Sequence, residues 1–539
     1  MPETKNNHTD CAEETRALTP KQRRAILTLI VIAGAALRLH KLAAQGLWYD
    51  EVSTLIAATV VDKFMVFLRP EMPLEPPLFP LLTRVWRAII DGTTHLSPGS
   101  NAYDFALRLL PCIIGVVSIP LAFQTCRALL KDERVALLAA FLTAISPFQI
   151  FYAQELRGYT LHVVLGLGAL FCFVRCLEGA TRRYWIGLTA LLALSIWNHF
   201  YSVWMLAAAD LYFLATFKAH RELLRKWIVA HALVLLLSVP PLHAAFTLNR
   251  LIAEIPFQWI PPPGLKTGFI TFKNFFAGYS PHPRAYWPLF LAAGAAFLGG
   301  LYALRKRPKC LWLVCVFSVA PIAGSALVWR VHRFSFYEHR LFILCGGVSA
   351  FVVAQGVFAL RKAHWKALAT GLLIALSVPC LADYYGSGFH PVPAHRLGVR
   401  HKVDARAAAR YIARWRTKGD VVGHASHFTL VPFTYYLPDR GVSLCMDDAA
   451  RQGFLASYPN EAMWEHFGIM PVRIETATRN AERVWYVESW WEPFDLHPSC
   501  IAMRDWLDKH FTKEGAVPFY GITLYRYAKR HPSPNPASE

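Results

Sequence analysis

The chain has 539 residues, of which 55% are hydrophobic and 17% are charged, and its mean hydropathy is +0.30. Soluble domains carry about 25% charged residues, so this composition argues against a soluble protein and for one that crosses a membrane several times. The formal net charge of +20 would suit a nucleic-acid-binding protein. The basic residues are, however, spread over short loops between apolar segments, so we expect no nucleic acid as a partner.

Apolar stretches long enough to cross about 30 Å of hydrocarbon recur along most of the chain. The stretch 184–217 also fits one bent span, which would reverse the sidedness of everything after it. The segment 25–37 also fits the core of a signal peptide, although Arg38 and the polar leader favour an uncleaved first helix. We predict about eleven transmembrane helices, at 22–39, 107–126, 135–153, 159–177, 184–198, 199–217, 227–247, 285–304, 310–329, 341–360 and 365–384.

Short basic loops between these spans all fall on the side of the N-terminus, provided that 184–217 is two spans. An excess of Lys and Arg in short loops marks the cytoplasmic face. We therefore predict a multi-pass protein of the bacterial inner membrane, with a cytoplasmic N-terminus and a periplasmic region after residue 384. The loops are represented by Arg127, Arg182, Lys226, Arg305 and Arg361.

The remaining segments differ in composition from the spans. Residues 1–21 are polar and read as a disordered cytoplasmic leader, and residues 22–384 form the transmembrane part, with outer loops at 40–105 and 248–284. Within the second loop, the amphipathic stretch 266–276 fits a helix lying in the membrane interface. The tail 531–539 is rich in Pro and Ser and is expected to be disordered.

Residues 385–530 have the composition of a soluble domain. Helical spacing from Val403 to Trp415 is followed by strand-like runs at 420–422, 484–487 and 519–527. This alternation predicts a small extracytoplasmic α/β domain. Its basic stretch, 396–416, fits either a solvated helix face or a contact with anionic headgroups. Cys445 and Cys500 could pair in an oxidising periplasm or remain free thiols.

Four polar clusters fall at span ends on the predicted outer side: Asp50-Glu51, 154–157, 198–201 and 338–340. The first follows Gly46-Leu47-Trp48-Tyr49. Adjacent carboxylates near an apolar surface have raised pKa values and can serve as a general base or a metal ligand. Equally, Asp50 and Glu51 could simply open a helix and favour its dipole.

The second cluster contains Gln154, Glu155 and Arg157, flanked by Tyr152 and Tyr159. Arg157 offers a planar donor fork suited to a phosphate, and Glu155 could orient it or bind a metal. The alternative is a set of interfacial residues within an aromatic belt.

The other two clusters carry histidines. His199 and Tyr201 lie in a tight outer turn, where a single His is more often structural. Glu338, His339 and Arg340 open the tenth span. Cations at an outer boundary run against the charge rule, so an anionic headgroup is their natural partner. Together the four clusters predict an outward-facing site for an anionic lipid substrate.

These residues resemble those of bacterial glycosyltransferases of the GT-C superfamily, in particular the family 39 group. That group is related to protein O-mannosyltransferases and to the aminoarabinose transferase that modifies lipid A. The resemblance spans about residues 22–384, and Glu338-His339-Arg340-Leu341 stands where the family often has an Arg-Tyr pair. The matching segments are Arg38-Leu39, Leu47–Glu51, Glu75–Phe79, Arg108–Pro111 with Gly115, Ser146-Pro147, Tyr152–Tyr159, Asn198–Tyr201 and Trp259–Pro262.

The resemblance implies a polytopic GT-C-like fold and an inverting transferase that uses a polyprenyl-phosphate-linked sugar on the periplasmic side. The acceptor would be lipid A, another glycolipid, a polysaccharide or a protein. By the same resemblance, Asp50 would be the catalytic carboxylate supported by Glu51, and Arg157, His339 and Arg340 would face the donor phosphate. Some relatives bind a divalent metal near their carboxylates, which here would involve Asp50 and Glu155. The residues that would shape the substrate site are Gln154, Glu155, Tyr159, His199, Tyr201 and Glu338.

Two other functions compete with this interpretation. A transporter or flippase for a lipid-linked intermediate would place ionisable residues near the bilayer midplane and often show repeated halves. Here the charges gather at span ends, and no repeat is evident. A non-catalytic scaffold would leave the combination of Asp50, Glu51 and Arg157 unexplained.

Overall fold

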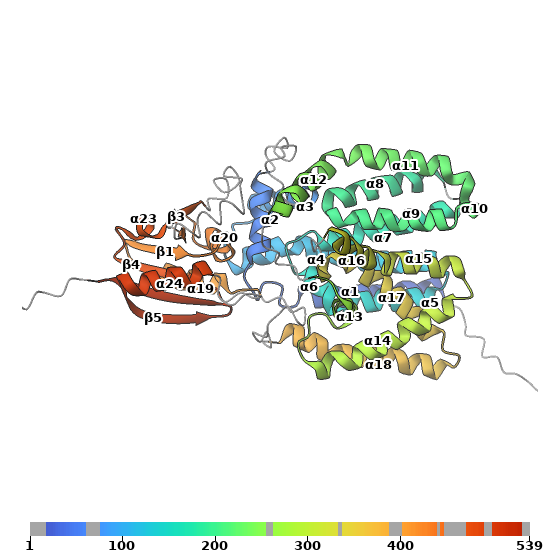
Figure 1. The fold of residues 1–539 in the computed structure, drawn as a ribbon. Helices are drawn as coiled ribbons and strands as arrows, with labels where there is room; N and C mark the ends of the chain where they lie inside the picture. The colour runs from blue at the N-terminus through green and yellow to red at the C-terminus, as the bar shows by residue number, and fades with distance from the viewer. Residues whose placement is uncertain are drawn as a thin grey trace, which may run out of the picture.

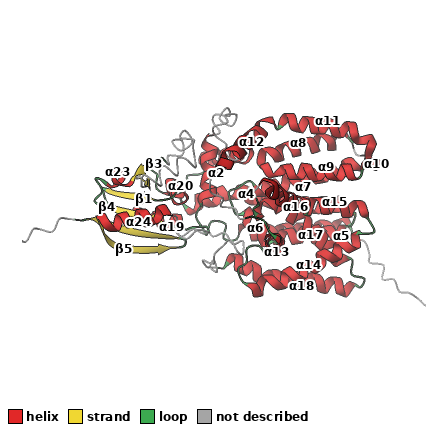
Figure 2. Cartoon of the chain, viewed as in Figure 1, coloured by secondary structure: helices red, strands yellow, loops and turns green. Residues whose placement is uncertain are grey.

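A computed structural model describes residues 18–60, 76–179, 181–254, 262–332, 337–386, 402–438, 442–446, 470–489 and 498–530. A body of helices occupies one end of the molecule and a mixed β-sheet with its own helices the other (Figures 1 and 2). Of the leader 1–21, predicted to be disordered, residues 1–17 lie outside the described residues, whereas Pro20 and Lys21 already belong to the first helix, which Thr19 caps. The tail 531–539 also lies outside the described residues. So do Glu75, the segment 259–261 and the basic residues 396–401.

The helical body runs from α1 to α18. Its helices are α1 (Pro20–Leu39), α2 (Tyr49–Val60), α3 (Leu78–Thr93), α4 (Asn101–Leu130), α5 (Glu133–Ile145), α6 (Pro147–Ala153), α7 (Tyr159–Leu177), α8 (Arg182–Asn198), α9 (Val203–Ala215), α10 (Phe217–His220), α11 (Leu224–Leu237), α12 (Val239–Glu254), α13 (Leu265–Ala277), α14 (Pro283–Leu304), α15 (Pro308–Ser318), α16 (Ala320–His332), α17 (Ile343–Phe358) and α18 (Ala363–Tyr385), with 3-10 turns at Phe200–Ser202, Arg221–Leu223 and His339–Phe342.

Five helical segments in the described residues are long and apolar enough to cross a membrane: α4, α7, α14, α17 with the turn before it, and α18. Each coincides with a predicted span. The number rises to eight if each of three sharply bent helix pairs is counted as one span. The predicted span 135–153 shows why the count differs, because Ser146 caps a new helix at Pro147 and the chain bends there by 58°. Eleven spans therefore remain a prediction.

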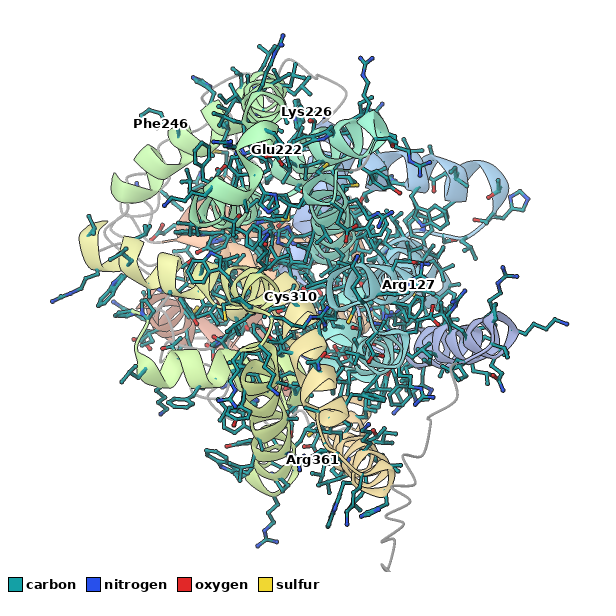
Figure 3. All side chains as sticks on the ribbon, turned by 90° about the vertical axis from the view of Figure 1, so that its right-hand side faces the viewer. Arg127, Glu222, Lys226, Phe246, Cys310 and Arg361 are labelled. Atoms are coloured by element: carbon teal, nitrogen blue, oxygen red, sulfur yellow. The ribbon has the colours of Figure 1, made fainter. Side chains whose placement is uncertain are left out.

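The basic loops gather at the end of the helical body away from the sheet. Arg23 and Arg127 both pair with Glu133, and Lys131 and Arg175 both pair with Glu178. Figure 3 views the molecule from this end, where Arg127, Lys226 and Arg361 come from three different helix ends. Because these loops lie far apart in sequence, their convergence agrees with the predicted separation of a basic face from the polar clusters.

The C-terminal part is a six-stranded sheet with strand order β3-β2-β1-β4-β6-β5. The first four strands are parallel, and β6 and β5 are antiparallel to their neighbours. Most of the run 519–527, predicted as a strand, lies in β6, whereas its first residues belong to the end of β5 and to a turn at Gly521, whose φ is +70°. The elements are α19 (Ala405–Trp415), β1 (Asp420–His424), α20 (His427–Tyr436), β2 (Val442–Met446), β3 (Pro471–Arg473), α23 (Ile474–Thr478), β4 (Arg483–Glu488), α24 (Pro498–His510), β5 (Phe511–Phe519) and β6 (Ile522–Lys529).

Both faces of this sheet are covered by helices. Ile412 of α19 packs with Val422 and Trp485 in one apolar cluster, and Met503 of α24 packs with Val484 in a second. Cys445 and Cys500 are buried free thiols in the second cluster.

The two parts of the molecule meet at Asp104, near the start of α4. Asp104 accepts hydrogen bonds from Arg406 of α19 and from the hydroxyls of Tyr435 and Tyr436. Arg406 lies in the basic stretch 396–416, for which the sequence allowed a solvated helix face or a contact with anionic headgroups. It fits neither, because its side chain is 7% exposed and paired with a carboxylate of the helical body. Leu430 of α20 joins an apolar cluster with residues of α2, α3 and α4.

The amphipathic stretch 266–276 forms most of α13. Its second half is buried, including Thr271 and Phe275, and Ser146 Oγ donates a hydrogen bond to the Phe275 carbonyl at 2.9 Å. This half of α13 therefore packs into the helical body. The membrane-interface position proposed from the sequence applies at most to its exposed first half.

Candidate active site

Asp50 and Glu51 lie in the first turn of α2, where their charge is favoured by the helix dipole. Consecutive residues of a helix point about 100° apart, so the two carboxylates face different surroundings. The backbone N–H of Glu51 donates to the Trp48 carbonyl, which begins the helix. From the sequence, Asp50 and Glu51 could open a helix or form a chemical site. The structure places both residues at a helix start.

Glu51 is fully buried and locked in place. Arg108 Nε and Nη2 donate to its two oxygens at 2.7 and 2.6 Å, and the Leu156 N–H donates at 2.9 Å. Lys402 Nζ lies 3.5 Å from Glu51 Oε2. Burial alone would raise the pKa of Glu51, but Arg108 and Lys402 lower it to about 2. Glu51 is thus a permanently charged anchor rather than a proton acceptor.

Asp50 has a more open environment, with a side chain that is 15% exposed. Its Oδ2 accepts a hydrogen bond from Arg340 Nη1 at 2.6 Å. Arg340 is buried, and its Nε has no hydrogen-bond partner. Arg340 belongs to the 3-10 turn His339–Phe342, which precedes α17. It contacts Asp50 of α2 although the two residues are 290 positions apart in the sequence.

Arg157 also contacts the start of α2. Its Nη1 donates to the Asp50 carbonyl at 3.3 Å and to Thr54 Oγ1 at 3.0 Å. The guanidinium carbons of Arg157 and Arg340 lie 5.9 and 5.6 Å from the centre of the Tyr159 ring, within cation–π range. Both arginines thus contact the ring of Tyr159 and the start of α2, Arg340 through the Asp50 carboxylate and Arg157 through the Asp50 carbonyl and Thr54.

Glu155 is the third carboxyl group of this region. Trp48 Nε1 donates to its Oε1 at 2.8 Å, whereas its buried Oε2 has no hydrogen-bond partner. Burial raises the pKa of Glu155 to about 7, with Lys402 acting against this shift and Glu51 and Asp50 adding to it. Near neutral pH, Glu155 can therefore exchange a proton.

Gln154 performs a structural task. Its Nε2 donates to the carbonyls of Arg38 and His40, both at 2.7 Å, and its Oε1 accepts from the Tyr384 hydroxyl at 2.6 Å. It therefore ties the end of α1 to the end of α18. All the described hydrogen bonds of its side chain are internal, and its contact with substrate stays a prediction.

The histidines separate into two groups. The His199 ring lies 5.8 Å from the Tyr159 ring and 6.0 Å from the Tyr201 ring, and its Nδ1 accepts from the Tyr201 N–H. His199 and Tyr201 therefore line the arginine side of the site. His339, by contrast, bonds Thr271 Oγ1 of α13 at 2.8 Å. Glu338 is half-buried and is one of the acidic groups around Arg340.

Two residues at the site were not singled out as site residues from the sequence. The sequence does indicate a role for Arg108, because a cation inside an apolar span is rare without a function or a partner. Lys402 carries no such signal, since it is one of many basic residues in 396–416. Its burial results from the docking of the C-terminal part on the helical body.

The described residues contain no group of three or more His, Cys, Asp or Glu side chains arranged to hold a metal ion. Moreover, Arg340 bonds Asp50 Oδ2 and Trp48 bonds Glu155 Oε1. These side chains fit an ion-paired site better than a metal site, so we derive no step through a metal.

Comparisons with known proteins agree with the resemblance seen in the motifs. Residues 75–243 match the family model for dolichyl-phosphate-mannose-protein mannosyltransferase. A search of curated proteins found no match.

Solved structures with the same fold include two enzymes. ArnT from Cupriavidus metallidurans in the apo state matches with a TM-score of 0.59 and 13% identity, over 93% of this chain and 98% of that one. ArnT bound to undecaprenyl phosphate matches with a TM-score of 0.55 and 13% identity, over 93% and 97%. The Archaeoglobus fulgidus oligosaccharyltransferase in the apo form matches with a TM-score of 0.53 and 14% identity, over 87% of this chain and 70% of that one.

The chain thus shares the fold of these solved structures, and its residues 75–243 match a mannosyltransferase family model. The similarity to ArnT agrees with the polytopic helical fold expected from the motifs, whereas the number of eleven spans stays a prediction.

Proposed function

We propose that this enzyme is an inverting glycosyltransferase that moves a sugar from a polyprenyl-phosphate donor to an envelope acceptor on the periplasmic face. The observation that carries the proposal is the position of Asp50. Its carboxylate is 15% exposed and accepts a hydrogen bond from Arg340, and its backbone carbonyl accepts one from Arg157. A base next to a doubly cationic phosphate position is the arrangement that transfer from a glycosyl phosphate requires.

The reaction assigns a role to each charged group. The acceptor hydroxyl attacks the anomeric carbon opposite the donor phosphate, and its proton passes to Asp50. The bond from the anomeric carbon to the phosphate oxygen breaks, and the leaving polyprenyl phosphate keeps the electron pair. Arg157 and Arg340 stabilise the charge that develops on that oxygen. Attack from the face opposite the leaving group inverts the configuration of the sugar.

Asp50 suits the base better than Glu51. Both Glu51 oxygens accept from Arg108, and the pKa of Glu51 is about 2. A carboxylate held in this way is a weak base, but it fixes the first turn of α2 and therefore the position of Asp50. Glu155, with a pKa near 7, can retain a proton beside the reacting groups. His199, Tyr201 and Tyr159 form the wall on the arginine side.

A lipid-linked donor is supported by the solved relatives. One ArnT structure was solved with undecaprenyl phosphate. The oligosaccharyltransferase AglB of Archaeoglobus fulgidus, with a TM-score of 0.51 and 12% identity over 86% of this chain and 69% of that one, was solved with a dolichol-phosphate and an inhibitory peptide. Both ligands carry a phosphate at the end of a polyprenyl-type chain, which is the feature that Arg157 and Arg340 would recognise here.

The periplasmic orientation rests on charge. The basic loops form one end of the helical body (Figure 3), and α2 with its carboxylates lies toward the sheet at the other (Figure 1). If the basic end is cytoplasmic, then Asp50 and the C-terminal part face the periplasm.

Mass spectrometry of envelope lipids and glycans tests this function. A strain lacking the gene is complemented with the wild type, Asp50→Asn, or Asp505→Asn, which changes an exposed carboxylate of α24. We expect the deletion and Asp50→Asn strains to lack one sugar on an acceptor and to accumulate a polyprenyl-phosphate sugar. The Asp505→Asn strain should match the wild type.

Two outcomes would contradict the proposal. A complete set of envelope glycans in the Asp50→Asn strain would remove Asp50 from its role. Accumulation of the lipid intermediate on the cytoplasmic leaflet of the deletion strain, rather than on the periplasmic leaflet, would favour the rival function, a flippase.

A further inference from the structure

A cavity of about 250 Å³ lies between the helical body and the start of the C-terminal part. It is smaller than the roughly 300–1,000 Å³ of pockets that enclose drug-sized ligands, so it suits a polar headgroup rather than a lipid chain. It is lined by Lys41, Leu42, Ala44, Gln45, Arg108, Phe151, Gln154, Tyr384, Tyr385, Gly386 and Lys402.

The lining of this cavity is strongly cationic. It includes Lys41, Arg108 and Lys402, and none of the described lining residues is acidic. The carboxylate closest to these cations in the described contacts is Glu51, whose two oxygens both accept from Arg108. Glu155 also interacts with Lys402, and Asp104 with Arg108. These carboxylates lie outside the lining of the cavity, in which the charged side chains among the described residues are all cationic.

Lys402 is the cation whose contacts leave most room for a ligand. Its side chain is 7% exposed, and its Nζ lies 3.5 Å from Glu51 Oε2, 3.4 Å from the Gln154 carbonyl and 5.5 Å from the centre of the Phe151 ring. Charge-assisted hydrogen bonds are normally about 2.7–2.9 Å long, and an ammonium group has three donors. A buried ammonium with only long contacts can accommodate an anion.

Lys41 supplies a second cation from an independent element. It follows α1 with a φ of +57°, so the chain turns sharply there, and its Nζ donates to the Tyr385 carbonyl at 2.7 Å. Lys41 is exposed whereas Lys402 is buried, so the cavity has a cation near its opening and another in its interior.

We propose that this cavity binds an anionic group, a phosphate or a carboxylate, on the acceptor, with Lys402 and Lys41 as its ligands. This inference rests on the proposed transferase function. Asp50 pairs with Arg340 on one side of the α2 start, and Glu51 pairs with Arg108 and Lys402 on another. In this proposal the donor phosphate and the acceptor anion occupy different sides of the same helix turn.

Direct binding to the purified full-length protein in detergent tests the assignment. The probes are glucose 1-phosphate as a sugar phosphate, methyl glucoside as its neutral counterpart, and undecaprenyl phosphate as the donor carrier. We expect glucose 1-phosphate to bind and methyl glucoside not to bind. Loss of one charge-assisted contact should weaken glucose 1-phosphate binding roughly tenfold in Lys402→Met and in Lys41→Met.

The controls separate this cavity from the donor site. Lys418→Met removes an exposed cation of the C-terminal part and should leave glucose 1-phosphate binding unchanged. Undecaprenyl phosphate binding should persist in Lys402→Met and weaken in Arg157→Met. Because Lys41 is exposed, its variant should fold even if Lys402→Met does not.

Two results would overturn the assignment. Equal binding of glucose 1-phosphate and methyl glucoside, or none of either, would show that the cavity is not an anion site. Weaker binding of undecaprenyl phosphate in Lys402→Met, with glucose 1-phosphate binding unaffected, would show that the donor carrier and not the acceptor occupies the cavity. Failure of the wild type to bind undecaprenyl phosphate would instead count against the proposed function.

Discussion

At the scale of single residues, the site depends on how neighbouring carboxyl groups are surrounded. Asp50 and Glu51 are adjacent in sequence, yet only Asp50 keeps an open side. The sequence could predict that this pair and Arg157 belong to one region, because they fall at span ends on one side. It could not predict how differently the two carboxylates are surrounded, since that depends on Arg108, Arg340 and Lys402 arriving from distant segments.

Replacing Glu51 should destabilise the protein through the cation that it leaves behind. Glu51→Gln leaves Arg108, whose side chain is 1% exposed, without its carboxylate partner. Breaking a buried ion pair costs about 3–5 kcal/mol. The thermal midpoint should fall clearly, and Glu51→Gln with Arg108→Met should recover part of the loss. Glu178→Gln breaks exposed pairs worth about 1 kcal/mol or less. Equal effects of Glu51→Gln and Glu178→Gln would be incompatible with a buried anchor.

Glu155 should make stability depend on pH. Its pKa is about 7 in the folded protein and near the ordinary value of about 4.3 when unfolded. The folded state therefore binds more protons between these values, and stability falls as pH rises through this window, by roughly 4 kcal/mol in total. Glu155→Gln should remove this loss, so its thermal midpoint should exceed that of the wild type increasingly from pH 5 to pH 8. A constant difference across this range would argue against a raised pKa.

At the scale of elements, most of the helical body could be anticipated from apolar length. Five predicted spans coincide with helices that pass the length and hydropathy requirement. Breaks within apolar runs were harder to predict, as at Ser146-Pro147, because both halves remain apolar. The hairpin at Gly521 was missed for a similar reason, since the run 519–527 continues its aromatic pattern through the turn.

The contact between α14 and α17 is set by two glycines. A Cβ on Gly300 would lie 2.0 Å from the Val352 carbonyl oxygen, and one on Gly356 would lie 1.8 Å from the Ala296 carbonyl oxygen. Gly300→Ala should therefore force the helices apart and cost about 1–3 kcal/mol, seen as a lower thermal midpoint. Gly294 of the same helix has nothing within 4 Å of such a Cβ. Gly294→Ala should be neutral or stabilising, and a similar loss in both variants would contradict this contact.

At the scale of the whole molecule, the C-terminal part completes the site of the helical body. Asp104 receives Arg406, Tyr435 and Tyr436, and the same docking brings Lys402 to Glu51. Its composition predicted a separate folded region, but composition carries no information on which residue of that region would be buried at the carboxylates.

The central claim is that Asp50 takes the acceptor proton during transfer from a lipid-linked donor. It is tested most directly by labelling the sugar in cells and following its loss from the polyprenyl-phosphate fraction during a chase. A general base contributes about 10²–10⁴-fold to a rate. We predict that Asp50→Asn slows this loss by at least about 100-fold, while the purified variant still binds undecaprenyl phosphate. Loss of the label at the wild-type rate in Asp50→Asn would contradict the account.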